Sequence, residues 1–300
     1  MSRVRYLQLD VFAARPGGGN PLGVVLGADD WTGEDMQCFA AWTDLVETTF
    51  LLPPATAEAS YRLRIFTPTR EIAFAGHPTI GSAHAALATG FVTAGDGRLV
   101  QECGAGLLPI LVEGEGADRR LLVQSPGATV LRRGLDADPQ LSAILADVRL
   151  GALAPAFIEG GRRWWLAELA DEASVRGWHP NHAAIAALAH ASDSLGLCVF
   201  ARCDNSDYDL VVRAFPAGVG IVEDPASGAA NGLIAAYVAD SEPLGGLGRG
   251  YRVSQGREIG RDARILIRIE DGAIWVGGET QLVIDGYADW PLRDATAGRA

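Results

Sequence analysis

Two segments of the chain, 77–83 (HPTIGSA) and 224–230 (DPASGAA), share the pattern His/Asp-Pro-x-x-Gly-small-Ala. Each leads into a stretch, 79–91 and 227–239, that would be small and apolar on nearly every side of a helix. A helix without a polar face has to be enclosed by other elements, and proline is tolerated in a first helical turn. The sequence therefore predicts two core helices, each wrapped by sheet.

Segments that alternate between apolar and polar residues lie on both sides of each predicted core helix. A chain of 300 residues favours two domains over one core, and the glycines and acids at 113–120 mark the best boundary. We expect an α+β fold with domains at 1–117 and 118–280, the segment 281–300 returning to complete the first.

Three further helices are expected at 32–45, 138–148 and 179–191. The first begins with Thr32 followed three residues later by Asp35, a variant of the capping box. The other two carry a proline near their start, where the helix does not need its N–H.

Composition excludes several functional classes. A net charge of -12 argues against a nucleic-acid partner, and no apolar run is long enough to span a membrane. The N-terminal segment lacks the apolar core of a signal peptide, which indicates a cytoplasmic protein. The cysteines do not have the spacing of a metal site, so we expect no metal and four reduced thiols, at Cys38, Cys103, Cys198 and Cys203.

The starts of the two core helices are candidate anion sites. Free N–H groups and the positive end of the helix dipole favour a carboxylate there, and glycine lets it approach the backbone. The alternative is that Gly81 and Gly228 only allow a helix to pack closely on a sheet. Because the motif occurs twice with a titratable leading residue, the sequence favours a small carboxylate-bearing substrate.

His77 and Asp224 lead the two copies and are the first candidate catalytic residues. A histidine can donate or accept a proton near neutral pH, whereas a carboxylate prefers to accept one. Each would be an ordinary turn residue if it stood alone. Glu47, between the helix at 32–45 and an apolar strand, is a third candidate because partial desolvation there would keep its proton available; a solvated strand end is the alternative.

Two loops add candidate binding residues. The glycines before Asn20 are followed by no lysine and no helix, so a nucleotide site is not expected, and a turn that holds Asn20 close to another backbone is favoured. In the segment 254–261 (SQGREIGR), Gln255 or Arg261 could bind a ligand, with a simple hairpin as the equal alternative.

Five motifs, in order, resemble the phenazine-biosynthesis PhzF-like family, whose relatives include diaminopimelate epimerase. They cover nearly the whole chain and comprise 19–26 (GNPLGVVL), 45–53 (LVETTFLLP), 66–83 (FTPTREIAFAGHPTIGSA), 222–232 (VEDPASGAANG) and 254–261 (SQGREIGR). The resemblance implies two pseudo-symmetric domains, each a mixed β-barrel around a central helix, with the site in the cleft between them.

The resemblance also implies a homodimer and the isomerisation of trans-2,3-dihydro-3-hydroxyanthranilate without cofactor or metal. Glu47 would be the group that moves the proton, with His77 and Asp224 facing it. Substrate-binding positions carried over from the motifs are Asn20, Gly76, Ser227, Gly228, Ala229 and Gln255.

Three departures bear on specificity. Ala229 stands where a serine is common in the family, and Asn231 stands where a small residue is usual. None of the cysteines lies in either copy of the repeat, which disfavours the two-thiol racemisation of the epimerase relatives. An isomerase of another small metabolite, or a binding protein without catalysis, therefore stays open as an alternative function.

Overall fold

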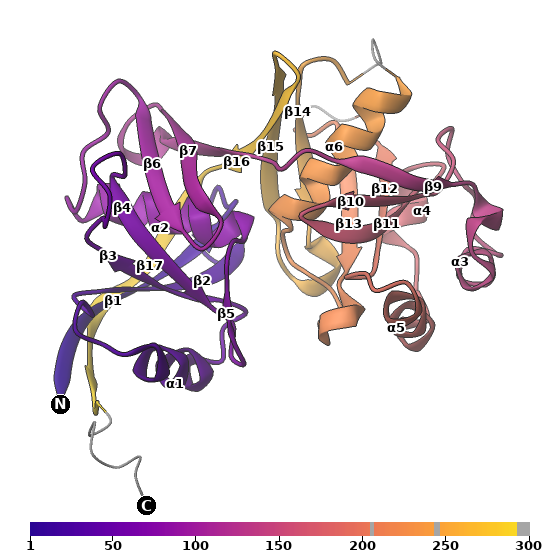
Figure 1. The fold of residues 1–300 in the computed structure, drawn as a ribbon. Coiled ribbons are helices and arrows are strands. Elements are labelled where there is room, and N and C mark those ends of the chain that lie inside the picture. The colour runs from indigo at the N-terminus through magenta and orange to yellow at the C-terminus, as the bar shows by residue number, and fades with distance from the viewer. Residues whose placement is uncertain (205–206, 243–246, 293–300) are drawn as a thin grey trace, which may run out of the picture. The chain divides into compact units, whose positions relative to one another are not determined.

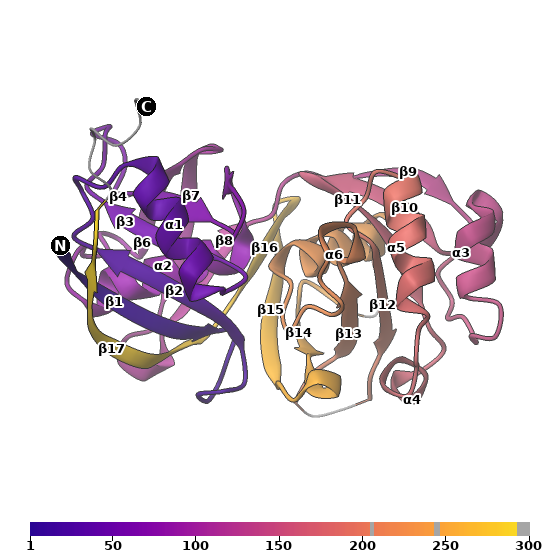
Figure 2. The same ribbon diagram turned by 90° about the horizontal axis from the view of Figure 1, so that it is seen from below.

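A computed structural model describes residues 1–204, 207–242 and 247–292. Contacts divide the chain into two units, of which the first comprises Met1–Val123 with Glu279–Ala300 and the second Gln124–Gly278. The end of the segment 281–300, expected to complete the first domain, lies outside the described residues. Figures 1 and 2 show the helices and strands of both units.

The first unit consists of one series of paired strands and two helices. Its elements are β1 (Ser2–Val11), β2 (Asn20–Leu26), α1 (Gly33–Thr43), β3 (Thr48–Leu52), β4 (Tyr61–Phe66), β5 (Glu71–Ile72), α2 (Gly76–Ala88), β6 (Arg98–Cys103), β7 (Gly106–Glu113), the 3-10 turn η1 (Gly116–Asp118), β8 (Arg120–Gln124) and β17 (Thr280–Trp290).

Strand pairing in the first unit combines antiparallel and parallel neighbours. β17, β1 and β2 pair antiparallel, β2 and β3 parallel, β3 and β4 antiparallel, β4 and β6 parallel, and β6, β7 and β8 antiparallel. Parallel neighbours need a crossover connection, and α1 and α2 are those crossovers. Helix α1 starts at the Thr32 cap, where the predicted capping box with Asp35 is confirmed.

The second unit has more helices. Its elements are β9 (Thr129–Arg133), η2 (Leu135–Ala137), α3 (Pro139–Ile144), β10 (Ala156–Gly160), β11 (Arg162–Glu168), α4 (Glu172–Arg176), α5 (His182–Ala191), β12 (Leu197–Arg202), β13 (Leu210–Phe215), η3 (Ala217–Val219), α6 (Gly228–Ser241), β14 (Gly250–Gln255), η4 (Arg257–Ile259), β15 (Ala263–Glu270) and β16 (Ala273–Gly278).

Strand pairing in the second unit follows the same order of directions. β9, β10 and β11 pair antiparallel, β11 and β12 parallel, β12 and β13 antiparallel, β13 and β14 parallel, and β14, β15 and β16 antiparallel. Helices α4 and α5 make the first crossover and α6 makes the second. The predicted helices at 138–148 and 179–191 are observed as α3 and α5, capped by Asp138 and Asn181.

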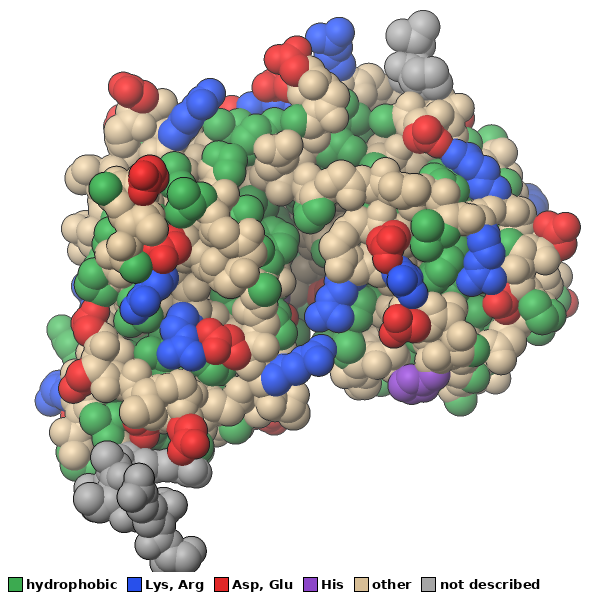
Figure 3. Space-filling view, in the orientation of Figure 1, with side chains coloured by type: hydrophobic (Ala, Val, Ile, Leu, Met, Phe, Trp, Pro, Cys, Tyr) green, Lys and Arg blue, Asp and Glu red, His purple; other side chains and the backbone are tan. Residues whose placement is uncertain are grey.

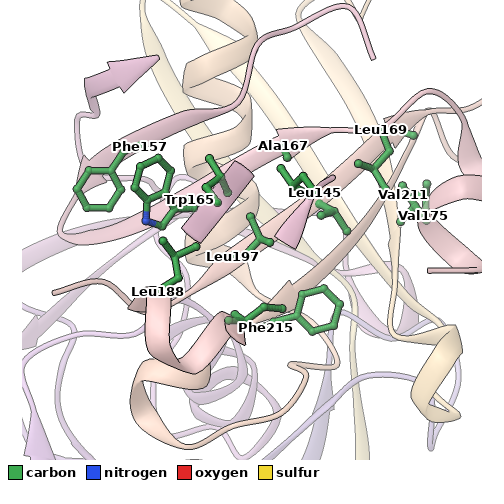
Figure 4. Packing of buried hydrophobic residues seen from close by; sticks show 14 residues of the cluster. Leu145, Phe157, Trp165, Ala167, Leu169, Val175, Leu188, Leu197, Val211 and Phe215 are labelled. Carbon is green, nitrogen blue, oxygen red and sulfur yellow. The ribbon is translucent and has the colours of Figure 1, made fainter. Parts of the chain in front are cut away.

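A hydrophobic cluster fills the space between the sheet of the second unit and helices α3 to α5 (Figure 4). Alternate strand residues such as Leu197 and Val199 face this cluster, as the two-residue period of a strand requires. Trp165 stacks on Phe157 with ring centroids 4.5 Å apart.

Both predicted core helices are present, and most of their residues are buried. In α2 a Cβ on Gly81 would lie 2.5 Å from the side chain of Leu22 and 2.7 Å from that of Val11. The close-packing alternative for Gly81 is therefore the one that the structure supports.

On the face of the molecule in Figure 3, acidic and basic side chains are interspersed.

The two copies of the repeated motif do not occupy the same place relative to their helices. His77 is the second residue of α2, whereas Asp224 lies before Ser227, the N-cap of α6. Pro78 is in the first turn of α2, but Pro225 precedes α6. The expectation that His77 and Asp224 are equivalent positions of one repeat is thus wrong. Gly76 and Gly228, each the first residue of its helix, are the positions that correspond.

Candidate active site

Glu47 and His77 form a buried pair in the first unit. Glu47 immediately precedes β3, and the parallel pairing of β3 with β2 places it beside the start of β2. Helix α2 brings His77 to the same place, so that His77 Nε2 lies 3.3 Å from Glu47 Oε2. Only 9% of Glu47 and 7% of His77 are exposed. The solvated strand end considered for Glu47 is therefore not what the structure has.

The other nitrogen of His77 fixes the ring. The side chain forms a hydrogen bond with the backbone of Pro21, and since proline has no N–H, the histidine donates and the Pro21 carbonyl accepts. This bond uses Nδ1, because Nε2 has no hydrogen-bond partner among the described residues. Burial lowers the pKa of His77 to about 3. The hydrogen bond to Pro21 raises this pKa, but by less than burial lowers it. His77 is therefore neutral near pH 7.

A neutral His77 with its proton on Nδ1 presents the lone pair of Nε2 to the Glu47 carboxyl group. Two acceptor atoms 3.3 Å apart repel each other unless a proton lies between them. The contact is therefore one across which a proton can be shared between the Glu47 carboxyl group and Nε2. A carboxyl group held in this way can deliver a proton and, once deprotonated, recover one.

Asn20 and Gly76 lie next to this pair. Asn20 is the first residue of β2, is 1% exposed, and precedes the proline whose carbonyl orients His77. Gly76 is the first residue of α2, where the N-cap position is Ala75 and no side chain caps the helix. The N–H groups of this first turn can therefore meet a ligand without displacing a capping side chain.

Asp224 lies in the second unit on a well-fixed loop. Its backbone N–H donates to Ala214 O at 2.9 Å, and its Oδ1 accepts from the N–H of Ala226 at 3.2 Å. The side chain is half-buried. Burial, and to a smaller degree the charge of Asp224, raises the pKa of the Cys198 thiol. Cys198 is thus a protonated thiol beside Asp224 and is unsuited to act as a nucleophile.

Gln255 joins the Asp224 loop to the start of α6. Its Nε2 donates to Asp224 O at 2.8 Å, while its Oε1 accepts from Ser227 N at 3.3 Å and from Asn231 Nδ2 at 2.9 Å. Gln255 is fully buried. Next to it, Gly256 has φ 90°, and a Cβ there would lie 2.5 Å from Pro225 O. The amide of Gln255 therefore holds the loop in place.

The first turn of α6 contains the remaining predicted binding residues. Ser227 is the N-cap, and its Oγ accepts from Ala230 N at 3.3 Å. Gly228 is buried and Ala229 is exposed. The Ser227 hydroxyl group is therefore already used to cap the helix. The N–H groups of Gly228 and Ala229 are the donors that a ligand could meet.

Two features were missed by reasoning from sequence. The Pro21 carbonyl that orients His77 is a backbone group and has no sequence signature. Arg213 pairs with Glu223 through two hydrogen bonds of 2.9 and 2.8 Å, with both side chains buried. An arginine within the otherwise apolar strand LVVRAF was the available signal for this pair.

The described residues contain no group of three or more His, Cys, Asp or Glu side chains that could hold a metal ion. No described helix has the length and apolar character needed to cross a membrane.

A model of the family described as phenazine biosynthesis-like protein, PhzC-PhzF, matches residues 9–288. The chain belongs to this family. The resemblance seen in the five motifs is therefore confirmed. Among its relatives, the trans-2,3-dihydro-3-hydroxyanthranilate isomerase of Pseudomonas aeruginosa is 32% identical over 292 residues, which cover 95% of this chain and 99% of that one.

Other relatives of this chain carry different names. An uncharacterized isomerase of Deinococcus radiodurans is 31% identical and covers 96% of this chain and 94% of its own. Antisense-enhancing sequence 1 of Schizosaccharomyces pombe is 30% identical, covering 95% of this chain and 99% of its own. Two of these three names state an isomerase, which agrees with the expected activity.

Solved structures are similar in fold. A PhzF-family protein of Bacillus anthracis has a TM-score of 0.83 at 24% identity and covers 96% of this chain and 99% of its own. A hydroxyproline epimerase of Agrobacterium vitis has a TM-score of 0.62 at 12% identity, covering 95% and 92%. The fold is accordingly that of PhzF and epimerase-like proteins, with mixed sheet and helices.

Proposed function

We propose that this protein is an isomerase that moves a proton within a small carboxylate-bearing substrate. The observation that carries the proposal is the buried contact of His77 Nε2 with Glu47 Oε2, with His77 neutral and oriented by Pro21. A binding protein without catalysis has no need of such a pair. The names of the isomerase relatives support the same reaction class.

In the proposed cycle, Glu47 starts with the shared proton and delivers it to one carbon of the substrate. Its carboxylate then faces the lone pair of His77 Nε2, and this contact makes it a stronger base. Glu47 recovers a proton from a second carbon, which completes the isomerisation without a net change in protons. Acid–base help of this kind accelerates reactions by about 100- to 10,000-fold.

The second unit supplies binding groups in this proposal. Asp224, and the N–H groups of Gly228 and Ala229, hold polar groups of the substrate, while Gln255 and Ser227 position them. In the first unit, Asn20 and the N–H of Gly76 bind the part of the substrate near Glu47. The reaction uses these side chains and backbone groups, with no cofactor or metal.

The substrate that we propose is trans-2,3-dihydro-3-hydroxyanthranilate or a close analogue, which would place the protein in phenazine biosynthesis or a related pathway. The relative from Pseudomonas aeruginosa is named for that compound. Ala229, where the family commonly has a hydroxyl group, is the position at which specificity would differ. A hydrogen bond gained or lost there is worth about 1 kcal/mol.

We further propose that the two units are pseudo-symmetric epimerase-like domains, each a mixed barrel around α2 or α6. The shared order of strand directions in the two units supports this. We also propose a cytoplasmic homodimer, as the family resemblance implies.

The test is a turnover assay with trans-2,3-dihydro-3-hydroxyanthranilate, followed by NMR. We expect the wild-type protein to convert it. The Glu47→Gln variant should bind the compound with similar affinity and lose at least about 100-fold in turnover. A Glu47→Gln variant that still turned over at the wild-type rate would refute the assignment of Glu47, while absence of wild-type turnover would refute the substrate.

A further inference from the structure

A buried pair of hydroxyl groups joins the strand that follows Glu47 to the helix that carries His77. Thr49 lies on β3, two residues after Glu47, and Ser82 lies on α2, five residues after His77. The two hydroxyl oxygens are 2.9 Å apart, and neither residue has any exposed surface. The hydroxyl pair is thus a second polar link between β3 and α2, beside the contact of Glu47 with His77.

The direction of the hydrogen bond between these hydroxyl groups follows from their other partners. Thr49 Oγ1 donates to Gly23 O at 3.2 Å. Because a hydroxyl group has only one proton to donate, Ser82 is the donor to Thr49. The N–H of Gly23 in turn donates to Glu47 O at 3.4 Å. The hydrogen bonds that start at Ser82 therefore end on the residue of β2 that holds the backbone of Glu47.

The two links between β3 and α2 are spaced alike along both elements. Side chains two residues apart point to the same side of an extended chain, so Glu47 and Thr49 both face α2. Two residues of a strand advance by about 7 Å, and the five helical residues from His77 to Ser82 advance by about 7.5 Å. A shift of α2 along β3 would therefore change both contacts together.

The hydroxyl of Ser82 is not used within its own helix. A serine inside a helix often bonds back to the carbonyl of the preceding turn, whereas Ser82 directs its proton across to Thr49. Apolar packing has no preferred direction, but a hydrogen bond restricts both distance and angle. The pair therefore restricts how α2 can move against β3.

We propose that Ser82 and Thr49 are positioning residues for the proton transfer. Their hydrogen bond fixes α2 against β3 and thereby maintains the 3.3 Å contact of His77 Nε2 with Glu47 Oε2. Their effect on the reaction depends on the proposed function of Glu47 in moving the proton.

The first test is turnover of trans-2,3-dihydro-3-hydroxyanthranilate by Ser82→Ala and Thr49→Val. A small displacement of reacting groups is costly, so kcat should fall by about 10- to 100-fold while KM stays unchanged. Thr49→Ser keeps the hydroxyl group and should keep the wild-type kcat. The control is Ser192→Ala in the second unit, where the lost hydroxyl accepts from the Trp165 indole N–H at 3.1 Å; its kcat should also be that of the wild-type protein. Wild-type kcat in both Ser82→Ala and Thr49→Val would overturn the proposal.

The second test needs no substrate and therefore separates the positioning role from the proposed function. In ¹⁵N-labelled protein, the NMR resonance of His77 Nε2 reports the contact with Glu47. In Ser82→Ala and Thr49→Val this resonance should move toward its position in Glu47→Ala, where the contact is absent. In Thr49→Ser and Ser192→Ala it should stay at the wild-type position.

The two tests have different meanings when they disagree. A wild-type protein without turnover would refute the proposed substrate, while the expected movement of the His77 resonance would still support the positioning of the pair. A resonance that stays at the wild-type position in both Ser82→Ala and Thr49→Val would overturn the positioning role.

Discussion

His77 Nε2 lies 3.3 Å from Glu47 Oε2, although the two residues come from different crossover segments of the first unit. Neither local sequence nor helix spacing brings them together, since the contact depends on the parallel pairing of β2 with β3 and on the start of α2. The bond from His77 to Pro21 then fixes which ring nitrogen faces the carboxyl group. The proposed proton transfer and the pH dependence of stability both depend on this arrangement.

Burial of His77 makes the stability of the protein depend on pH. Its pKa is lowered from 6.5 to about 3, so between these values the unfolded chain binds a proton that the folded chain does not. The free energy of unfolding should therefore fall as the pH decreases from about 6.5 toward 3, by up to about 1.4 kcal/mol per pH unit. Urea unfolding of wild type and His77→Gln at several pH values measures this slope. An equal slope in both proteins would rule out His77 as its source.

Removal of the Ser227 hydroxyl should destabilise α6. Ser227→Ala loses the cap on Ala230 N and should lower the free energy of unfolding by about 1 kcal/mol. Thr32→Ala, which removes the corresponding cap of α1, is the matched comparison in the first unit. A Ser227→Ala variant as stable as wild type would show that the hydroxyl is not needed as a cap.

Gln255 should matter for the integrity of the Asp224 loop. Gln255→Leu keeps the volume but leaves the Ser227 N–H and the Asn231 amide without their acceptor. Each buried group left unsatisfied costs about 1–3 kcal/mol, so the free energy of unfolding should fall by at least about 2 kcal/mol. Gln37→Leu, at a half-buried residue whose side-chain amide donates to Thr67 O at 2.9 Å, is the control and should lose less. Equal losses in the two variants would show that the hydrogen bonds of Gln255 contribute no more than an ordinary half-buried one.

The buried ion pair before Asp224 should behave as a unit. Arg213→Met leaves Glu223 buried without its bidentate partner and should cost about 3–5 kcal/mol. The double variant Arg213→Met/Glu223→Leu removes both charges and should recover much of that loss. Chemical denaturation of the two single variants and the double variant forms a complete cycle. Additive losses would indicate that the two side chains do not interact.

Much of the fold was predictable because its signals are local. Thr32 and Asp35 mark the start of α1, and the apolar stretches after Gly76 and Ser227 indicate buried helices whatever surrounds them. The predicted equivalence of His77 and Asp224 is wrong because two similar sequence motifs can begin their helices at different residues. The Ser227 cap sets the start of α6. Similarly, Gln255 was recognised as a polar loop residue, but its three internal hydrogen bonds require the folded chain.

The measurement that tests the central claim most directly is deuterium incorporation during turnover in D₂O. If Glu47 delivers its own exchangeable proton first, the product formed by the wild-type protein should carry deuterium at the newly protonated carbon, as detected by NMR. Glu47→Gln should bind substrate and form no deuterated product. Deuterated product formed by Glu47→Gln at the wild-type rate would contradict the claim that the Glu47–His77 pair moves the proton.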